Sequence, residues 1–130
     1  MRVYGDARHC PVNVIDTATN LVITTLLIPW DSAKDILVTP DGRFAYIANA
    51  SFPEVDAIDT TTYQLTTIPT GGRSRRVCIS PAGDRVYATN YHDDAVFAID
   101  TATQQLIATI PIGQGARPMG IAMTPDGEEV

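Results

Sequence analysis

The sequence has few of the features that mark a catalytic, metal-binding or membrane-spanning protein. Its 130 residues include only two cysteines, Cys10 and Cys78. Two cysteines fit neither a disulfide framework nor a zinc site, so we expect two unpaired thiols. No apolar run approaches the roughly 20 residues that cross a bilayer, and residues 1–6 lack the apolar core of a signal peptide. The motifs G-x-S-x-G, H-E-x-x-H and the P-loop are also missing.

Positive charge is scarce as well. The formal net charge is -6, the pI is near 4.6, and Lys34 is the sole lysine beside eight arginines. The field of such a protein repels nucleic acid and anionic membrane surfaces, so neither is expected as a partner. Hydrophobic residues make up 45% of the chain and mean hydropathy is +0.02, which favours a folded domain over disorder.

What the sequence does contain is a repeat with a period of about 42 residues. Two motifs recur three times each: Ile-Asp-Thr at 15–17, 58–60 and 99–101, and Thr/Ser-Pro-x-Gly at 39–42, 80–83 and 124–127. Residues 42–65 align without a gap onto residues 83–106. We therefore place repeats at about 1–42, 43–83 and 84–127 within one segment of residues 1–130, and expect the final residues to begin a further strand.

Each repeat predicts four short antiparallel strands. In the clearest copy they span residues 77–80, 85–90, 95–100 and 105–110, which are rich in β-branched and aromatic residues. Pro-x-Gly between the first two predicts a tight hairpin turn, since Pro presets φ and Gly supplies a positive φ. Asp-Thr-x-Thr between the last two predicts turns capped by the Asp carboxylate and Thr hydroxyls. Ile-Pro then ends the fourth strand, as suits an outer edge.

The second and third strands are apolar on both faces, as residues 44–48 and 96–99 show. In an antiparallel sheet with one solvent-exposed face, apolar and polar residues alternate along each strand. These strands do not alternate, so we expect both faces of each sheet to be covered. Four-stranded sheets covered on both sides at a fixed period are typical of β-propeller blades. The fold class is thus all-β, with a β-propeller preferred; a two-sheet sandwich is the alternative, but does not explain the period.

Three elements together resemble the YVTN-family β-propeller repeat: Pro-Asp-Gly, the segments Tyr46–Asn49 and Tyr87–Asn90, and Ile-Asp-Thr-x-Thr. The resemblance implies a propeller of usually about seven blades in exported, periplasmic or cell-surface proteins. Similar repeats also occur beside haem d1-type and lactonase-like propellers, so the fold alone does not decide the function.

Three repeats are fewer than the four to eight blades that close a propeller ring. We weigh two explanations of this incomplete ring. The chain is a fragment of a longer reading frame, or two copies associate head to tail as a homodimer that closes a six-bladed ring.

Ligands of propellers usually bind on the face where the loops surround the central channel. There Arg73, Arg75 and Arg76 precede a strand, and Arg117 falls at the position of Arg73 in the next repeat. A cationic rim on an acidic protein favours a carboxylate or phosphate ligand. The alternative is a solvated loop whose arginines pair with acids such as Asp93 and Asp94.

Three other residues are weaker candidates. His9 and His92 occupy equivalent loop positions and offer metal or haem ligands, but two histidines make an incomplete set, so no metal or other cofactor is expected. Trp30, the sole tryptophan, is either an exposed anchor for a partner or packed against the neighbouring blade.

The leading functional prediction is a non-enzymatic module that binds a protein partner or an anionic small ligand. No nucleophile, base and orienting acid recur together at a plausible spacing. The alternative is an enzyme subunit, either a lactonase-like hydrolase or a haem d1-type redox propeller, with its site at the channel mouth.

Overall fold

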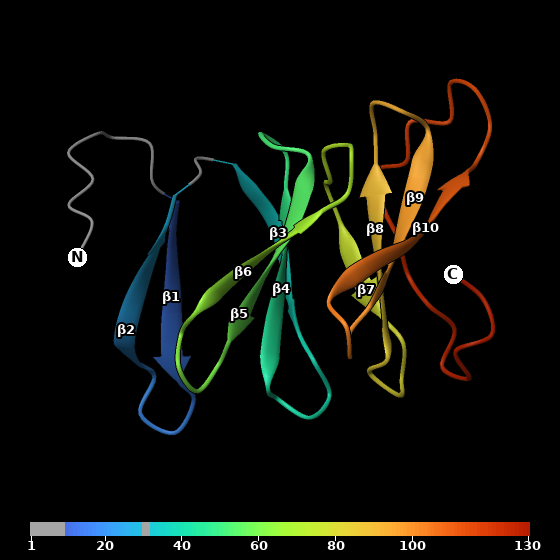
Figure 1. The fold of residues 1–130 in the computed structure, drawn as a ribbon. Helices are drawn as coiled ribbons and strands as arrows, with labels where there is room; N and C mark the ends of the chain where they lie inside the picture. The colour runs from blue at the N-terminus through green and yellow to red at the C-terminus, as the bar shows by residue number, and fades with distance from the viewer. Residues whose placement is uncertain (1–9, 30–31) are drawn as a thin grey trace.

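The computed structural model describes residues 10–29 and 32–130, and these residues form ten strands. Figure 1 shows them in three sheets that stand side by side along the chain. The strands are β1 (Cys10–Asp16), β2 (Leu21–Ile28), β3 (Ala33–Val38), β4 (Phe44–Asn49), β5 (Glu54–Asp59), β6 (Leu65–Pro69), β7 (Val77–Ile79), β8 (Arg85–Asn90), β9 (Ala95–Asp100) and β10 (Gln105–Pro111). The described part of the chain holds no helix that is long and apolar enough to span a membrane.

Two of the sheets are complete four-stranded antiparallel meanders. The middle sheet has the order β3-β4-β5-β6, and the third sheet, β10-β9-β8-β7, repeats that order. The first sheet pairs β1 with β2. The predicted strands of the third sheet agree with the structure to within one residue at every end. The all-β prediction is therefore confirmed, and three sheets in an open row exclude the two-sheet sandwich (Figure 1).

The middle sheet stacks on its neighbours because it buries apolar side chains on both of its faces. Ala45, Tyr46, Ile47 and Ala48 follow one another along β4, and each is at most 8% exposed. Neighbouring residues of a strand point to opposite faces, so a run of buried residues requires a layer on either side. The sequence-based prediction for this strand is confirmed.

One hydrophobic cluster joins the middle sheet to the third sheet. Its members are Tyr46, Ala48, Val55, Ala57 and Ile68 from one side, and Val77, Val86, Ala88, Phe97 and Ile99 from the other. A second, smaller cluster joins the middle sheet to the first through Ile28, Ala45, Ile47 and Ile58. The two faces of β4 thus serve two different interfaces.

Large apolar side chains remain exposed at both ends of the row. At one end they include Ile15, Leu21, Val22, Ile23 and Leu27 on the first sheet. At the other end they include Ile107 and Ile110 on β10, and Ile112, Met119 and Val130 in the segment that follows it. Exposed apolar patches of this kind mark surfaces that another element covers. That further blades or a second copy cover them stays a prediction.

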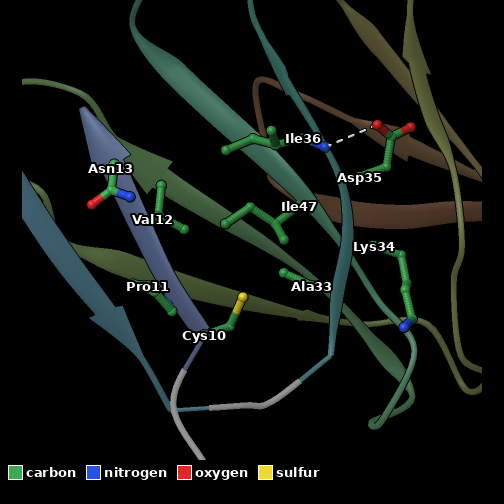
Figure 2. Close-up of a pocket in the computed structure, with 9 residues that line it drawn as sticks. All are labelled: Cys10, Pro11, Val12, Asn13, Ala33, Lys34, Asp35, Ile36 and Ile47. Carbon is green, nitrogen blue, oxygen red and sulfur yellow. Dashed lines mark hydrogen bonds between the residues drawn. The ribbon is translucent and has the colours of Figure 1, made fainter. Parts of the chain in front are cut away.

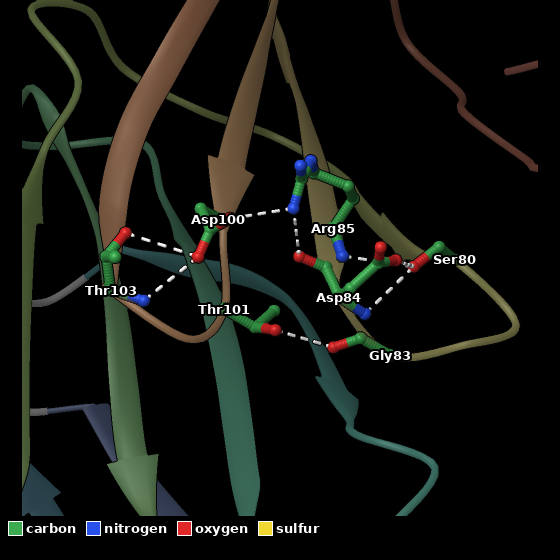
Figure 3. Close-up of polar contacts among 7 residues, drawn as sticks. All are labelled: Ser80, Gly83, Asp84, Arg85, Asp100, Thr101 and Thr103. Atoms are coloured by element: carbon green, nitrogen blue, oxygen red, sulfur yellow. Dashed lines mark hydrogen bonds and ion pairs between the residues drawn. The ribbon is translucent and has the colours of Figure 1, made fainter.

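The repeated turn residues hold the blade hairpins together (Figure 3). The Asp100 carboxylate accepts a hydrogen bond from the backbone N–H of Thr103 at 2.9 Å, and such bonds lower its pKa. The hydroxyl of Thr101 donates to the carbonyl of Gly83 at 2.6 Å, and Thr60 does the same to Gly42. The motif predicts that its threonines bond within their own turn, and Thr103 does so, because its hydroxyl donates to the Asp100 carboxylate at 3.2 Å. Thr60 and Thr101 differ. They instead tie the turn between the third and fourth strands to the turn between the first and second.

Two of the three hairpin-turn glycines, Gly83 and Gly127, also lie close to the preceding repeat, whereas a Cβ on Gly42 would meet nothing within 4 Å. Gly83 has φ of +76°, and a Cβ there would sit 3.1 Å from Cδ of Pro40. Gly127 repeats both features against Pro81.

Residues 112–130 contain no strand, so the predicted further strand is not seen there. The turn at 124–127 nevertheless closes with the expected hydrogen bond from Gly127 N–H to the Thr124 carbonyl.

Candidate functional site

The candidate site lies on the face that carries the β4–β5 and β8–β9 loops, at the upper edge of the view in Figure 1. The hairpin turns described above occupy the opposite edge. The connection from β6 to β7, which holds Arg73, Arg75 and Arg76, reaches the same loop face. The predicted arginines are therefore on the expected side of the sheets.

Two of these arginines stack on one aromatic ring. The Cζ atom of Arg75 lies 4.6 Å from the ring centroid of Tyr91, and the Cζ atom of Arg117 lies 5.8 Å from it. Cation–π contacts of this length fix a guanidinium plane without using its hydrogen-bond donors. Donors on both groups therefore remain available to a ligand.

The loop of Arg117 is fixed by a carboxylate from the neighbouring loop. Both oxygens of Asp94 accept backbone hydrogen bonds at 2.7 Å, one from Arg117 and one from Gly115. These two bonds, with a smaller contribution from the Arg117 charge, lower the pKa of Asp94. Asp94 is thus used in holding the loop, and no ion pair links it to an arginine among residues 10–29 and 32–130.

Arg75 also lines a hollow of about 170 Å³ with Lys34, Arg76 and Met119. The Arg75 guanidinium is 3.2 Å from the Met119 sulfur. Arg76 lies 3.8 Å from the Asp35 carboxylate and donates to the Lys34 carbonyl. We call the hollow and its adjoining stack the arginine groove. Its residues are Lys34, Arg75, Arg76, Tyr91, Arg117 and Met119.

The other candidates lie apart from this groove. Arg73 faces a different cleft, which it shares with His92 and Asp93. His92 is exposed, and its ring meets Tyr91 edge to face at 5.5 Å. His9 and Trp30 fall outside the described residues. Within the described ranges, no three His, Cys, Asp or Glu side chains gather in a way that could hold a metal ion.

The repeated asparagines have a role that sequence reasoning missed. The side-chain oxygen of Asn49 accepts backbone hydrogen bonds from Ser51 and Phe52, and that of Asn90 accepts them from His92 and Asp93. Both asparagines are 1% exposed. Each one shapes the loop that follows it. Their repetition at the ends of two strands was the available signal.

A further hollow, of about 380 Å³, lies between β1 and β3 (Figure 2). Its walls are largely apolar and include Val12, Ala33, Ile36 and Ile47, with the Cys10 thiol at one side.

Cys10 and Cys78 are both unpaired, as predicted. Burial raises the pKa of Cys78 to about 11, which leaves little reactive thiolate at neutral pH.

One buried carboxylate carries no assigned function. Asp56 is 1% exposed and accepts hydrogen bonds from Asn49 at 3.3 Å and Thr67 at 3.1 Å. Burial raises its pKa, and these two bonds offset only part of the rise. The equivalent position in the first sheet holds Asn13, which accepts a hydrogen bond from Thr25 at 2.9 Å. A neutral amide therefore fits this place in the blade.

We expect Asp56→Asn to stabilise the protein by about 1 kcal/mol at pH 7, the usual scale for relieving an imperfectly compensated buried polar group. A carboxyl whose pKa is raised on folding costs stability as pH climbs from its ordinary value through the raised one, so the gain should vanish below about pH 4. Urea unfolding across this pH range measures it. A gain that is equal at pH 4 and pH 7 would contradict the assignment.

Comparison with known proteins supports the fold. The chain is similar to Kuenenia stuttgartiensis hydrazine synthase, with a TM-score of 0.82 and 27% identity over 90% of this chain and 34% of that one. This chain is a run of β-propeller blades. It is also similar in fold to the dihydro-haem d1 dehydrogenase NirN, with a TM-score of 0.67 and 20% identity over 81% of this chain and 23% of that one.

The blades thus span about a third of the hydrazine synthase chain and about a quarter of NirN. No protein-family model and no curated protein matches the sequence. The β-propeller part of the sequence-based prediction is confirmed. The YVTN label stays a prediction.

Proposed function

We propose that this run of blades is a binding module whose arginine groove takes a small anionic ligand carrying carboxylate or phosphate groups. The observation that carries the proposal is the convergence of Arg75 and Arg117, from successive connections, on the ring of Tyr91. Guanidinium groups bind carboxylate and phosphate through paired hydrogen bonds.

The charge balance of the groove supports an anion. Lys34, Arg75, Arg76 and Arg117 place four cationic side chains in or beside it. Of the nearby acids, Asp35 accepts the backbone N–H of Val77, and Asp94 holds the Arg117 loop. This local excess of positive charge stands out in a chain with a net charge of -6. An anion that enters the groove neutralises it.

Titration with citrate and with inorganic phosphate, followed by calorimetry, tests the proposal. The double variant Arg75→Ala/Arg117→Ala is expected to lower the affinity for the better of the two anions at least tenfold, since each lost charged hydrogen bond is worth about 1.5–3 kcal/mol. Binding should also weaken as salt is raised from 50 to 500 mM.

The matched control is Arg43→Ala. Arg43 lies 5.8 Å from the ring centroid of Phe44, so it too stacks on an aromatic ring, but it lies at a hairpin turn on the opposite face. The control should leave anion binding unchanged. Equal affinity in the double variant and the parent protein, or an equal loss in the control, would remove the proposal.

A second candidate function is that of a propeller within an enzyme, as a redox or hydrolytic subunit. The similarity to hydrazine synthase favours it, because that protein is named for a reaction. Among the residues that the structure describes, His92 is the one histidine available to such a site, and it is exposed on the loop face. A visible haem spectrum in the purified protein, or turnover of a lactone panel, would support this function over simple binding.

A further inference from the structure

The cleft that contains Arg73 is separate from the arginine groove. It has a volume of about 530 Å³, within the usual range for small-molecule sites. Its walls come from the β4–β5 loop, the β6–β7 connection and the β8–β9 loop, so it lies between the middle and third sheets. We call it the Arg73 cleft. The lining residues that matter here are Phe52, Pro53, Gly72, Arg73, His92 and Asp93.

The connection that carries Arg73 is held rigidly. The hydroxyl of Thr70 donates to the Gly72 carbonyl at 2.7 Å, and the Thr70 N–H donates to the Pro53 carbonyl at 3.0 Å. Ser74 is fully buried and bonds across the interface, with its N–H on the Asn49 carbonyl and its hydroxyl accepting the Asn49 N–H. The backbone on both sides of Arg73 is therefore fixed while its side chain is exposed.

The two facing loops are fixed as well. The Asn49 side chain orders the backbone at Phe52, and the Asn90 side chain orders the backbone at His92 and Asp93. All three walls of the cleft are thus formed before a ligand arrives. A preformed site spends little of its binding free energy on ordering its own loops.

The cleft is lined by one guanidinium, that of Arg73, and one carboxylate, that of Asp93. Asp93 accepts a hydrogen bond from the Asn90 amide at 2.6 Å, so part of its capacity is used within the loop. The Arg73 side chain makes no hydrogen bond or ion pair with any residue in the described part of the chain. A guanidinium in that state has a full fork of donors to offer a carboxylate.

The remaining wall is apolar. Phe52 is 40% exposed, and Pro53 beside it is exposed too. His92 also lines the cleft and contributes a second ring. Flat apolar walls near a guanidinium favour a ligand that joins a planar ring to a carboxylate.

We propose that the Arg73 cleft binds small aromatic carboxylates, with the carboxylate on Arg73 and the ring against Phe52 and Pro53. This goes beyond the anion binding assigned to the arginine groove, because it concerns different residues and a different ligand class. Either site can be present without the other.

Titrations with benzoate and with its neutral analogue benzamide test this proposal, using NMR chemical shifts of the chain as the readout. Benzoate should bind at least tenfold more tightly than benzamide and shift the amides of residues 71–73 and 92–93. Arg73→Ala should abolish this preference. Arg73→Lys, which keeps the charge and loses the fork, should retain only part of it.

The ring contact has its own test. Phe52→Ala should weaken several-fold the benzoate binding that the amides of residues 71–73 report, whereas Arg75→Ala should leave the shifts of these amides unchanged. Equal binding of benzamide and benzoate at these amides, or a full preference for benzoate there in Arg73→Ala, would overturn the proposal. Loss of the benzoate-induced shifts at residues 71–73 in Arg75→Ala would move the ligand to the arginine groove and overturn the proposal as well.

Discussion

Replacing Phe97 with alanine is expected to cost about 3–5 kcal/mol of folding free energy, the usual range for a large aromatic side chain lost from a packed core. Phe97 is 2% exposed and belongs to the cluster that joins the middle sheet to the third. The alanine would leave a cavity between two sheets. Each sheet is fixed by its own ladder of hydrogen bonds, so neither can close the gap without losing register.

Urea unfolding followed by circular dichroism measures this loss. Phe97→Leu gives a milder second variant, expected to cost about 1–1.5 kcal/mol, in case the alanine protein does not fold. Phe52→Ala is the matched control: the same change at a side chain that is 40% exposed should cost less than about 1 kcal/mol. If Phe97→Ala and Phe52→Ala cost the same, the interface between the sheets does not stabilise the fold.

The strands were predictable because each one is bounded by turn chemistry that depends on local residues only. Pro81 and Gly83 fix one hairpin, and Gly83 has the positive φ that such a turn requires. Asp100 closes the next turn through its own carboxylate. The apolar runs between these turns left no freedom about which residues form strands. Local signals of this kind do not depend on the rest of the fold.

The sequence could not predict which side chains contact one another at the loop face, as Arg73 and Arg117 show. They hold equivalent places in the repeat, yet Arg117 stacks on Tyr91 and Arg73 faces another cleft. Ala50 stands in the middle sheet at the position of Tyr91, so Arg73 has no equivalent ring to stack on. Asp94 captures the backbone of the Arg117 loop, while Pro53 stands at the equivalent position of the middle sheet and has no carboxylate to do so.

The same reasoning explains what was missed about the repeated polar residues. The sequence marks Thr60, Thr101, Asn49 and Asn90 by repetition, but repetition does not name a bonding partner. Thr60 bonds to Gly42, which is 18 residues away, because the antiparallel pairing brings two turns to one end of the sheet. Contacts across strands become visible only once the register is known.

Replacing Gly72 with alanine should be the second most damaging of the changes considered, at about 1–3 kcal/mol, the range for adding a methyl group to a filled space. A Cβ on Gly72 would overlap the Asn90 amide and lie 2.8 Å from an oxygen of Asp93 and 3.0 Å from Cζ of Phe97. None of the three can withdraw freely. The Asn90 amide bonds to Asp93 and accepts two backbone N–H groups, and Phe97 is in the core.

Gly120→Ala is the control for this change, because a Cβ there would meet nothing within 4 Å and φ is not in the left-handed region. It should leave stability within about 0.5 kcal/mol of the parent protein. In Gly72→Ala the damage should also be local, so the amide resonances of His92 and Asp93 should shift along with the fall in unfolding free energy. Unchanged stability and unchanged loop resonances would mean that the Asn90 side chain moves aside at no cost, and that the walls of the Arg73 cleft are less rigid than the hydrogen bonds indicate.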